Sequence, residues 1–534
     1  MSLYLFLLYA EGLSSLIKAS VANGVMKGIS VCREGLELSH LFFADDSLIF
    51  CRASLEDCDE FQRMLGVYQR ALGQQLNRAK TSLFFSKNTP REIQGEIQRR
   101  FGAQVIKQHE KYLGLSSLVR KNKWNTFNNI KEKLGKKLAG WKEKLLSKVG
   151  REILIKAVAL AIPTYTMSCF KIPESLYDDL TSMIRNFWWG QKPEEKEIPW
   201  VSWEKMCEPK ACGRMGFKNL KCFNLVLIAK QGWRLQLAQD SLVFRILKAK
   251  YFPRCDFILA SVGHNPSYTW RIIMVAQELV KEGVMWRVGN GRDVKVWGDR
   301  WLPCSSSHVV ISPRLFLHED TWVGELIDID AMCWKSLVVD SIFLPHEVEA
   351  IKSIPLSVCF PLDKLVWAET ANGKFTVISA YHLVVRISFS ENRGSASDCS
   401  LMRRFWRSLW RLPIPHKVRH FAWRACRAAL PTKVNLKRTK VLTEDSCEWC
   451  KVKPETIGHV LWGCPKAQEA WECSKLVLSL DRRECSKLVL SLDRRGDISF
   501  MDILWWMLLA ENVNLDCVFR LVMVAWKLWH SRNE

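Results

Sequence analysis

Three cysteines and one histidine near the end of the chain have a spacing that suits a metal ion. Cys447 and Cys450 form a Cys-x-x-Cys pair, His459 follows after eight residues, and Cys464 after four more. Three thiolates and an imidazole favour a closed tetrahedral Zn²⁺ site, in which a turn supplies two ligands and a helix bearing His459 supplies the others. Free buried cysteines are the alternative, with Cys473 as a less well spaced substitute ligand.

Two adjacent carboxylates, Asp45 and Asp46, lie between the apolar arms Leu41–Ala44 and Ser47–Phe50. This pattern predicts a β-hairpin with acid at its tip. Crowded like charges are unfavourable unless a cation neutralises them, and two-metal phosphoryl transfer uses carboxylates to hold Mg²⁺. Asp45 is the expected Mg²⁺ ligand, and a plain tight turn is the alternative because Asp suits turns.

A basic segment rich in tryptophan lies directly before the cysteine cluster. Its cations alternate with Trp406, Trp410 and Trp423. Such a segment can hold phosphates with its cations and stack bases on indole faces. In the alternative, the tryptophans form a helical core and only the cationic face meets solvent. The candidate nucleic-acid-binding residues are Arg403, Arg404, Arg407, Arg411, Lys417 and Arg419.

Positive charge is concentrated in two parts of the chain. The 534 residues include 78 Lys and Arg against 55 acids, a net charge of +23. Residues Arg78–Lys156 hold 20 basic and 6 acidic side chains, and Leu401–Lys440 holds 12 basic side chains and no acid. This surplus favours polyanionic partners, so RNA and DNA are the expected partners.

Composition indicates a folded intracellular protein with several domains. A hydrophobic content of 48% is enough to build cores, and the length predicts roughly two to four domains. The 19 cysteines are odd in number and no secretory signal precedes them, which predicts a reducing compartment, the nucleus or the cytoplasm. The apolar start Leu3–Ala10 is followed by Glu11 and predicts a buried helix, so no membrane partner is expected. The sequence does not indicate the oligomeric state.

Periodicity predicts the elements that position these residues. A helix over residues 3–17 should lead into a strand within Gly35–Phe43, and residues 62–156 form a basic helical region. Trp286–Trp301 predicts a short hairpin with Asn290-Gly291 at its turn. Asp363–Leu383 predicts a strand, a turn at Asn372-Gly373, a second strand and the start of a helix.

A twelve-residue segment, Glu472–Arg483, is repeated without change as Glu484–Arg495. Solenoids need several longer repeats, so this copy is a recent duplication that extends a loop or helix.

Three ordered motifs carry a family resemblance. Ser39–Arg52 resembles the aspartate motif of plant LINE-type (non-LTR) retrotransposon reverse transcriptases. Gly73–Ser82 resembles the palm motif that follows, and Lys111–Leu115 resembles the primer-grip region. The cysteine cluster, together with residues 375–381 and 421–424, resembles the zinc-binding domain found downstream of such transcriptases.

The resemblance implies an α+β fold and a catalytic set. Asp45, Asp46 and Lys80 would be catalytic, since the family's lysine lies near the incoming nucleotide's phosphates; a solvated lysine is the alternative for Lys80. The expected regions are a partial reverse-transcriptase palm (1–118), a mainly helical, basic thumb-like and Trp-rich connector region (119–303), a linker region (304–372), a small zinc-binding domain (373–475) and C-terminal helices with the tandem duplication (476–534).

The beginning of the chain departs from the family. There, a helix like Leu3–Ile17 follows a Gly-rich motif that shapes the nucleotide pocket and, further upstream, a strand with another catalytic aspartate. Here no Asp precedes Asp45. We therefore expect an N-terminally truncated, nucleic-acid-binding relative of RNA-directed DNA polymerases that cannot extend a primer alone. The alternatives are an active polymerase completed by a missing upstream segment and a zinc-dependent interaction module without a nucleic-acid role.

Overall fold

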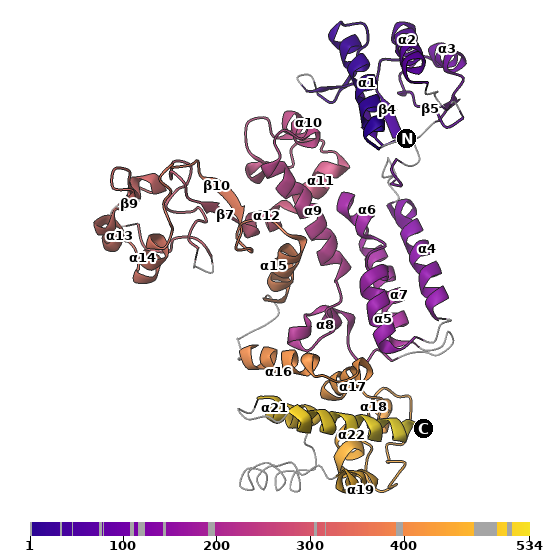
Figure 1. Ribbon diagram of the computed structural model, residues 1–534, viewed down its shortest axis with the longest axis vertical. Coiled ribbons are helices and arrows are strands. Elements are labelled where there is room, and N and C mark those ends of the chain that lie inside the picture. Colours follow the sequence, from indigo (N-terminus) through magenta and orange to yellow (C-terminus); the bar gives the residue numbers. More distant parts are fainter. Residues whose placement is uncertain are drawn as a thin grey trace. The chain divides into compact units, whose positions relative to one another are not determined.

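The chain is rich in helices, and its described strands form only two-stranded pairs (Figure 1). This mixed composition agrees with the expected α+β class, while the palm assignment stays a prediction. The computed structural model describes residues 3–32, 35–44, 46–73, 77, 79–106, 112–115, 123–142, 146–190, 198–303, 307–314, 317–390, 399–474, 499–509 and 515–534. Most of the tandem duplication, residues 475–495, lies outside these ranges.

Two compact units divide the chain. Unit 1 comprises Met1–Thr126 and Val226–Leu383, and unit 2 comprises Phe127–Leu225 and Val384–Glu534. The chain passes between them within helices α4 (Lys123–Lys142), α9 (Leu220–Leu237) and α15 (Val377–Ser390).

The first part of unit 1 contains three helices and short strand pairs. Ser54 begins the second helix by accepting a hydrogen bond from the Asp57 backbone N–H, and Gly73, with a φ of 67°, ends it. Small apolar clusters around Met64 and Ile97 hold the helices together. The elements are α1 (Leu3–Ala22), β1 (Ile29–Ser30), β2 (Glu37–Leu38), β3 (His40–Phe43), β4 (Asp46–Ile49), α2 (Leu55–Leu72), β5 (Ser82–Leu83), α3 (Arg91–Phe101) and β6 (Gln104–Val105).

The predicted hairpin at the aspartate pair is confirmed. Strands β3 and β4 are antiparallel, with Phe43 opposite Asp46 and His40 opposite Ile49. Ala44 adopts a φ of 48°, the left-handed conformation that a tight turn between the arms requires. His40 is held by the Ser14 hydroxyl at 2.9 Å, and burial lowers the pKa of its imidazole.

Helix α1 is buried only in its second half, so the expectation of a buried apolar start is wrong for its first turns. Ile17 is fully buried, whereas the side chains of Tyr4 and Leu8 are 80% and 67% exposed. By length and composition Tyr4–Ala22 is the one described helix able to cross a membrane. A core helix or an N-terminal signal sequence can have the same length and composition, so this finding by itself does not show that the helix spans a membrane.

The second part of unit 1 surrounds a core of tryptophans and aliphatic residues. Trp297, Trp301 and Trp334 pack there with Val323 and Ile351, so residues on both sides of position 304 share one core. The elements are α10 (Leu242–Tyr251), η3 (Phe257–Leu259), α11 (Tyr268–Val275), α12 (Gln277–Gly283), β7 (Val284–Arg287), η4 (Val323–Leu326), β8 (Ile327–Asp328), β9 (Cys333–Trp334), α13 (Ser336–Ile342), α14 (Pro345–Lys352) and β10 (Lys364–Trp367).

The predicted hairpin over Trp286–Trp301 is wrong. Strand β7 pairs with the distant strand β10, with Trp286 opposite Leu365. The Asp363 carboxylate accepts the backbone N–H groups of Gly289, Gly291 and Asp293, and so folds the Asn290-Gly291 turn into a loop instead of a hairpin. The second strand expected after Gly373 is also not formed, because residues 374–376 lead directly into α15.

Unit 2 is almost entirely helical. Its N-terminal half holds α4 (Lys123–Lys142), α5 (Lys148–Leu154), the π-helical turn η1 (Ile155–Ala159), α6 (Thr164–Cys169), α7 (Glu174–Trp189), α8 (Trp203–Cys207) and η2 (Lys210–Cys212). Its C-terminal half holds α16 (Cys399–Arg411), α17 (His416–Cys426), α18 (Lys433–Arg438), η5 (His459–Gly463), α19 (Pro465–Cys473), α21 (Phe500–Leu509) and α22 (Leu515–Asn533).

Gly213 joins the two halves of unit 2. Its carbonyl accepts hydrogen bonds from Trp423 Nε1 at 3.0 Å and from Arg427 Nε at 2.9 Å. Gly213 has a φ of 74°, and a Cβ there would lie 2.1 Å from a ring carbon of Trp406. Only glycine allows this close approach of backbone and indole.

Candidate metal centre and nucleic-acid interface

The four predicted metal ligands lie together in unit 2. The ligand atoms of Cys447, Cys450, His459 and Cys464 are all within 4.8 Å of one another, and Cys450 Sγ lies 3.2 Å from His459 Nε2. Tetrahedral Zn²⁺ with thiolate bonds of about 2.3 Å places its ligand atoms about 3.8 Å apart. The donor set and its spacing therefore fit one zinc ion. Cys473 is exposed and does not belong to this group.

A tight turn positions the first two cysteines. The Cys447 carbonyl accepts the Lys451 N–H at 2.8 Å, and the Cys447 N–H donates to the Lys453 carbonyl at 2.9 Å. Lys451 adopts a φ of 56°, which reverses the chain directly after Cys450. Both thiols are thereby presented to the same side of the turn.

Two short helical segments position the other ligands. His459 begins the π-helical turn η5, and the Cys464 N–H donates to the His459 carbonyl at 2.8 Å. Cys464 then caps the N-terminus of α19, with Pro465 at the first helical position. The positive end of a helix dipole favours a thiolate there.

The local environment prepares two ligands for metal binding. The backbone N–H groups of Lys453 and Val452 hold the pKa of the Cys450 thiol below its usual value. Burial and the nearby Lys453 lower the pKa of His459, so its imidazole stays neutral. Burial raises the pKa of Cys464, an effect that a bound cation opposes.

Glu455 anchors the metal-binding turn to the rest of unit 2, a role that sequence reasoning missed. Its side chain is fully buried, accepts the Lys433 N–H at 2.9 Å, and pairs with Arg532 of α22. A buried carboxylate needs such partners to remain charged. The sequence shows that Glu455 lies close to the metal-binding turn, which could have marked it as a structural residue. Its partner Arg532 on α22 is 77 residues away, so their pairing could not be predicted from spacing.

Comparison with known proteins agrees with this geometry. Residues 375–471 match the family described as zinc-binding in reverse transcriptase. An uncharacterized mitochondrial protein of Arabidopsis thaliana is 40% identical over 144 residues, which cover 27% of this chain and 94% of that protein. This chain belongs to the family of that mitochondrial protein.

A second relative is longer. The Arabidopsis thaliana protein named "Putative ribonuclease H protein" is 30% identical over 352 residues, which cover 65% of this chain and 55% of that protein. The chain thus matches about half the length of this relative. Together with the zinc-binding domain, these relatives support a reverse-transcriptase-like origin for the chain.

Within the zinc-binding domain, α16 separates cations from aromatic residues. Arg403, Arg404, Arg407 and Arg411 are exposed, whereas Trp406 on the opposite face is fully buried. Trp423 of α17 is also fully buried. These two indoles therefore form the core and cannot stack bases, as the alternative interpretation of the sequence held.

The last two predicted nucleic-acid-binding residues lie on α17. Lys417 is exposed, and its ammonium lies 4.6 Å from the ring of Trp526. Arg419 is half-buried and donates to the carbonyl of Trp410 at 2.8 Å. Arg419 thus satisfies a carbonyl near the end of α16 and does not join its exposed arginine face.

The structure describes only part of the predicted catalytic set. Asp45 lies outside the described residues. Asp46 is exposed at the start of β4, and Lys80 is exposed in a turn where its N–H donates to the Asn77 carbonyl at 3.1 Å. Among the described residues, Cys447, Cys450, His459 and Cys464 are the one group of three or more acids, cysteines or histidines close enough to hold a metal.

Proposed function

We propose that this reverse-transcriptase-like chain binds RNA or DNA through the arginine face of α16, defined as Arg403, Arg404, Arg407 and Arg411. The observation that carries the proposal is the amphipathic division of this helix. Phe405, Trp406 and Leu409 of this helix are fully buried in unit 2, and the four arginine side chains are exposed to solvent.

The arginine face is available to an anion. Within the described parts of the chain, none of its four guanidinium groups forms an ion pair with a carboxylate, although many other cations do. From Arg403 to Arg411 the helix rises about 12 Å. Duplex DNA carries about one charge per 1.7 Å, so a face of this length meets several phosphates of either a strand or a duplex.

Binding of this kind shows little sequence preference. Arginines on a solvent face contact phosphates, and base readout requires groups that reach base edges in a groove. The buried Trp406 and Trp423 offer no stacking platform on this face. Zinc supplies structural stability here, because a closed set of three thiolates and one imidazole leaves no open position for chemistry.

The experiment is RNA binding by the full chain, measured by fluorescence anisotropy with a single-stranded oligonucleotide. Reversal of three charges, Arg403→Glu, Arg404→Glu and Arg407→Glu, should weaken binding about a hundredfold or more, since each lost phosphate contact is worth on the order of 1 kcal/mol.

A matched control reverses three exposed cations outside the arginine face, Lys230→Glu, Arg234→Glu and Arg245→Glu. It changes the net charge equally and should have a much smaller effect. Equal weakening by both triple variants would mean that overall charge, and not this face, attracts RNA. No binding by the wild-type chain would favour the zinc-dependent interaction module.

The β3–β4 hairpin supports a second candidate function, RNA-directed DNA polymerisation. In this hairpin Asp46 lies opposite Phe43, next to the turn between the two strands. The resemblance implies that the family holds its metal-binding carboxylates at this turn. In this proposal Asp45 and Asp46 bind Mg²⁺ and Lys80 lies near the nucleotide's phosphates. The further carboxylate that two-metal chemistry requires would have to come from another segment or another chain.

A further inference from the structure

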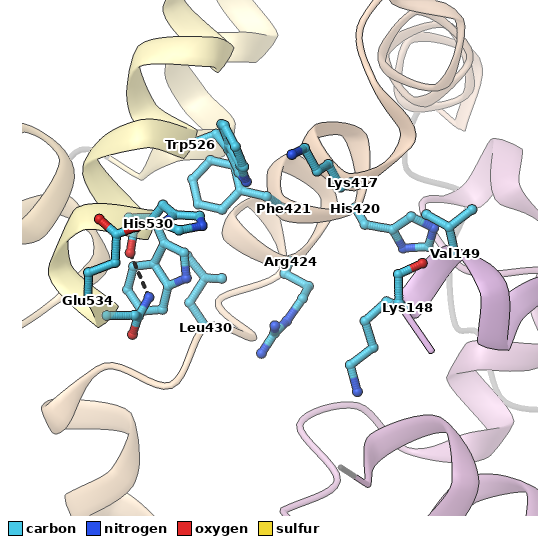
Figure 2. Close-up of a pocket in the computed structure, with 13 residues that line it drawn as sticks. Lys148, Val149, Lys417, His420, Phe421, Arg424, Leu430, Trp526, His530 and Glu534 are labelled. Atoms are coloured by element: carbon cyan, nitrogen blue, oxygen red, sulfur yellow. Dashed lines mark hydrogen bonds and ion pairs between the residues drawn. The ribbon is translucent and has the colours of Figure 1, made fainter. Parts of the chain in front are cut away.

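A pocket of about 410 Å³ lies within unit 2, lined by residues of α5, α17 and α22 (Figure 2). Its volume is in the range of sites that hold small organic molecules. The pocket is separate from the metal ligands and from the arginine face, since none of those residues lines it.

Arg424 is the central charge of this pocket. Its Nε donates to the Ala429 carbonyl at 3.1 Å, and within the described residues no carboxylate lies within 4.0 Å of its guanidinium. Burial lowers the pKa of Arg424 to about 10, which still leaves the group charged at neutral pH. Arg424 is partly buried. A partly buried cation without a counter-charge nearby is costly, and a bound anion would relieve that cost.

A second cation faces the same space. Figure 2 shows the side chains of Lys148 and Arg424 extending toward the same open side of the pocket. Lys148 Nζ is held in place by the carbonyls of Trp188 and Trp189 at 2.7 and 2.9 Å. The one acidic side chain of the lining, Glu534, is already bonded to His530 Nδ1 at 2.9 Å. The pocket is therefore positive.

An aromatic wall completes the pocket. Phe421, Trp526 and Trp529 line the pocket on this side. Phe421 and Trp529 are almost fully buried, and Trp526 is partly exposed. An indole face stacks with any nucleobase and contributes roughly 1–3 kcal/mol per base in single-strand binding. The Lys417 ammonium, 4.6 Å from the centre of the Trp526 ring, is a third cation of the lining. Cations beside a partly exposed indole match the two ends of a nucleotide, a phosphate and a base.

We propose that this pocket binds one nucleotide, either free or as a unit of a single strand, with its phosphate on Arg424 and Lys148 and its base against Trp526. This assignment rests on the proposed nucleic-acid binding and names a site for it that differs from the arginine face. The arginine face would hold the strand along its backbone, and the pocket would hold one unit of it.

The test is calorimetric titration of the full chain with adenosine 5′-monophosphate, adenosine and inorganic phosphate. The nucleotide should bind at least about tenfold more tightly than either fragment, because only the nucleotide uses both ends of the pocket. Arg424→Gln should weaken nucleotide binding about tenfold, and so should Trp526→Ala. The exposed Lys417→Gln should weaken it about threefold without disturbing the fold. Lys205→Gln, an exposed cation of α8 in the same unit, is the matched control and should have no effect.

The outcomes separate this inference from the proposed function. Competition by single-stranded RNA against the nucleotide assigns the site to a strand, and lack of competition assigns it to free nucleotide. RNA binding that depends on the arginine face, with no nucleotide binding or with binding indifferent to Arg424→Gln, Lys417→Gln and Trp526→Ala, would overturn the pocket and leave the proposed function intact. Equal affinity for phosphate and nucleotide would exclude any part for the aromatic wall.

Discussion

Glu152 and His420 are 268 residues apart in sequence, and the Glu152 Oε2 lies 3.0 Å from His420 Nε2 in the interior of unit 2. The other Glu152 oxygen, Oε1, lies 2.7 Å from both Lys156 Nζ and Lys210 Nζ. One carboxylate of α5 thus connects η1, the η2 turn and helix α17 of the zinc-binding domain. Removing it would leave two ammonium groups without their counter-charge.

We predict that Glu152→Gln lowers the free energy of unfolding by about 2 kcal/mol. Breaking a fully buried ion pair costs about 3–5 kcal/mol, and this value is reduced because the two lysine side chains are 33% and 40% exposed. Urea denaturation monitored by tryptophan fluorescence measures the change. The control Glu278→Gln removes an exposed partner of Lys281 and should cost less than about 0.5 kcal/mol. Equal effects of the two variants would contradict the prediction.

The same carboxylate predicts a pH dependence. Burial by itself raises the pKa of Glu152, but hydrogen bonds from His420 and the two lysines outweigh it and hold the pKa far below its usual value of 4.5. In the unfolded chain Glu152 takes up a proton near pH 4.5, whereas in the folded chain it does not, so its stabilisation is present above that pH and declines below it. The difference in stability between wild type and Glu152→Gln should therefore shrink as the pH falls from about 5. A constant difference between pH 7 and pH 4 would count against this ion cluster.

We predict that the full chain binds one zinc ion and that Cys450→Ser releases it. The tetrahedral site needs all four ligands, and the loss of one thiolate strongly weakens zinc binding. Metal analysis after dialysis measures the zinc content per chain. Cys473→Ser is the matched control, because this cysteine is exposed and outside the group. Loss of zinc from Cys473→Ser but not from Cys450→Ser would refute the assignment.

Removal of zinc should also destabilise unit 2. The turn that carries Cys447 and Cys450 also carries Glu455, which pairs with Arg532 of α22. Binding free energy of structural zinc is folding free energy, so a chelator should lower the midpoint of thermal unfolding for wild type and for Cys473→Ser. The melting curve of Cys450→Ser should not respond to the chelator. A wild-type curve that is equally indifferent would show that the fold does not depend on the metal.

We predict a steep salt dependence for RNA binding. Each phosphate neutralised in a single strand adds about 0.7 to the slope of log K against log salt concentration. The variant with Arg403→Glu, Arg404→Glu and Arg407→Glu should therefore show a slope shallower by about 2 than that of the wild type. Anisotropy titrations at salt concentrations from roughly 50 to 300 mM give both slopes. An unchanged slope would place the phosphate contacts elsewhere.

We predict that the purified chain by itself does not extend a primer on an RNA template with Mg²⁺ and nucleotides. Two-metal catalysis needs carboxylates from separate strands, and within the described residues no acidic cluster forms around Asp46. Incorporation of labelled nucleotide measures the activity. Robust extension that Asp45→Ala abolishes would disprove the prediction and show that another residue completes the site.

Short-range patterns determined part of this protein directly. Cys447 to Cys464 span few enough residues that a turn and a helix must bring the ligands together. The β3–β4 hairpin also forms between neighbouring segments, so two apolar arms on either side of adjacent carboxylates were enough to predict it. The division of α16 into arginines and aromatic residues was visible in the sequence as well, although the sequence did not decide which face is buried.

Only the tertiary structure decided which distant segments meet. Trp286 pairs with Leu365 instead of within its own segment, because the Asp363 carboxylate holds the intervening turn as a loop. Trp406 is buried because it packs against Gly213, a residue far from it in the chain. Periodicity reports which side chains lie on one face of an element, and it contains no information about which other element covers that face. The pairing of Glu152 with His420 follows from that covering, so the sequence by itself could not predict it.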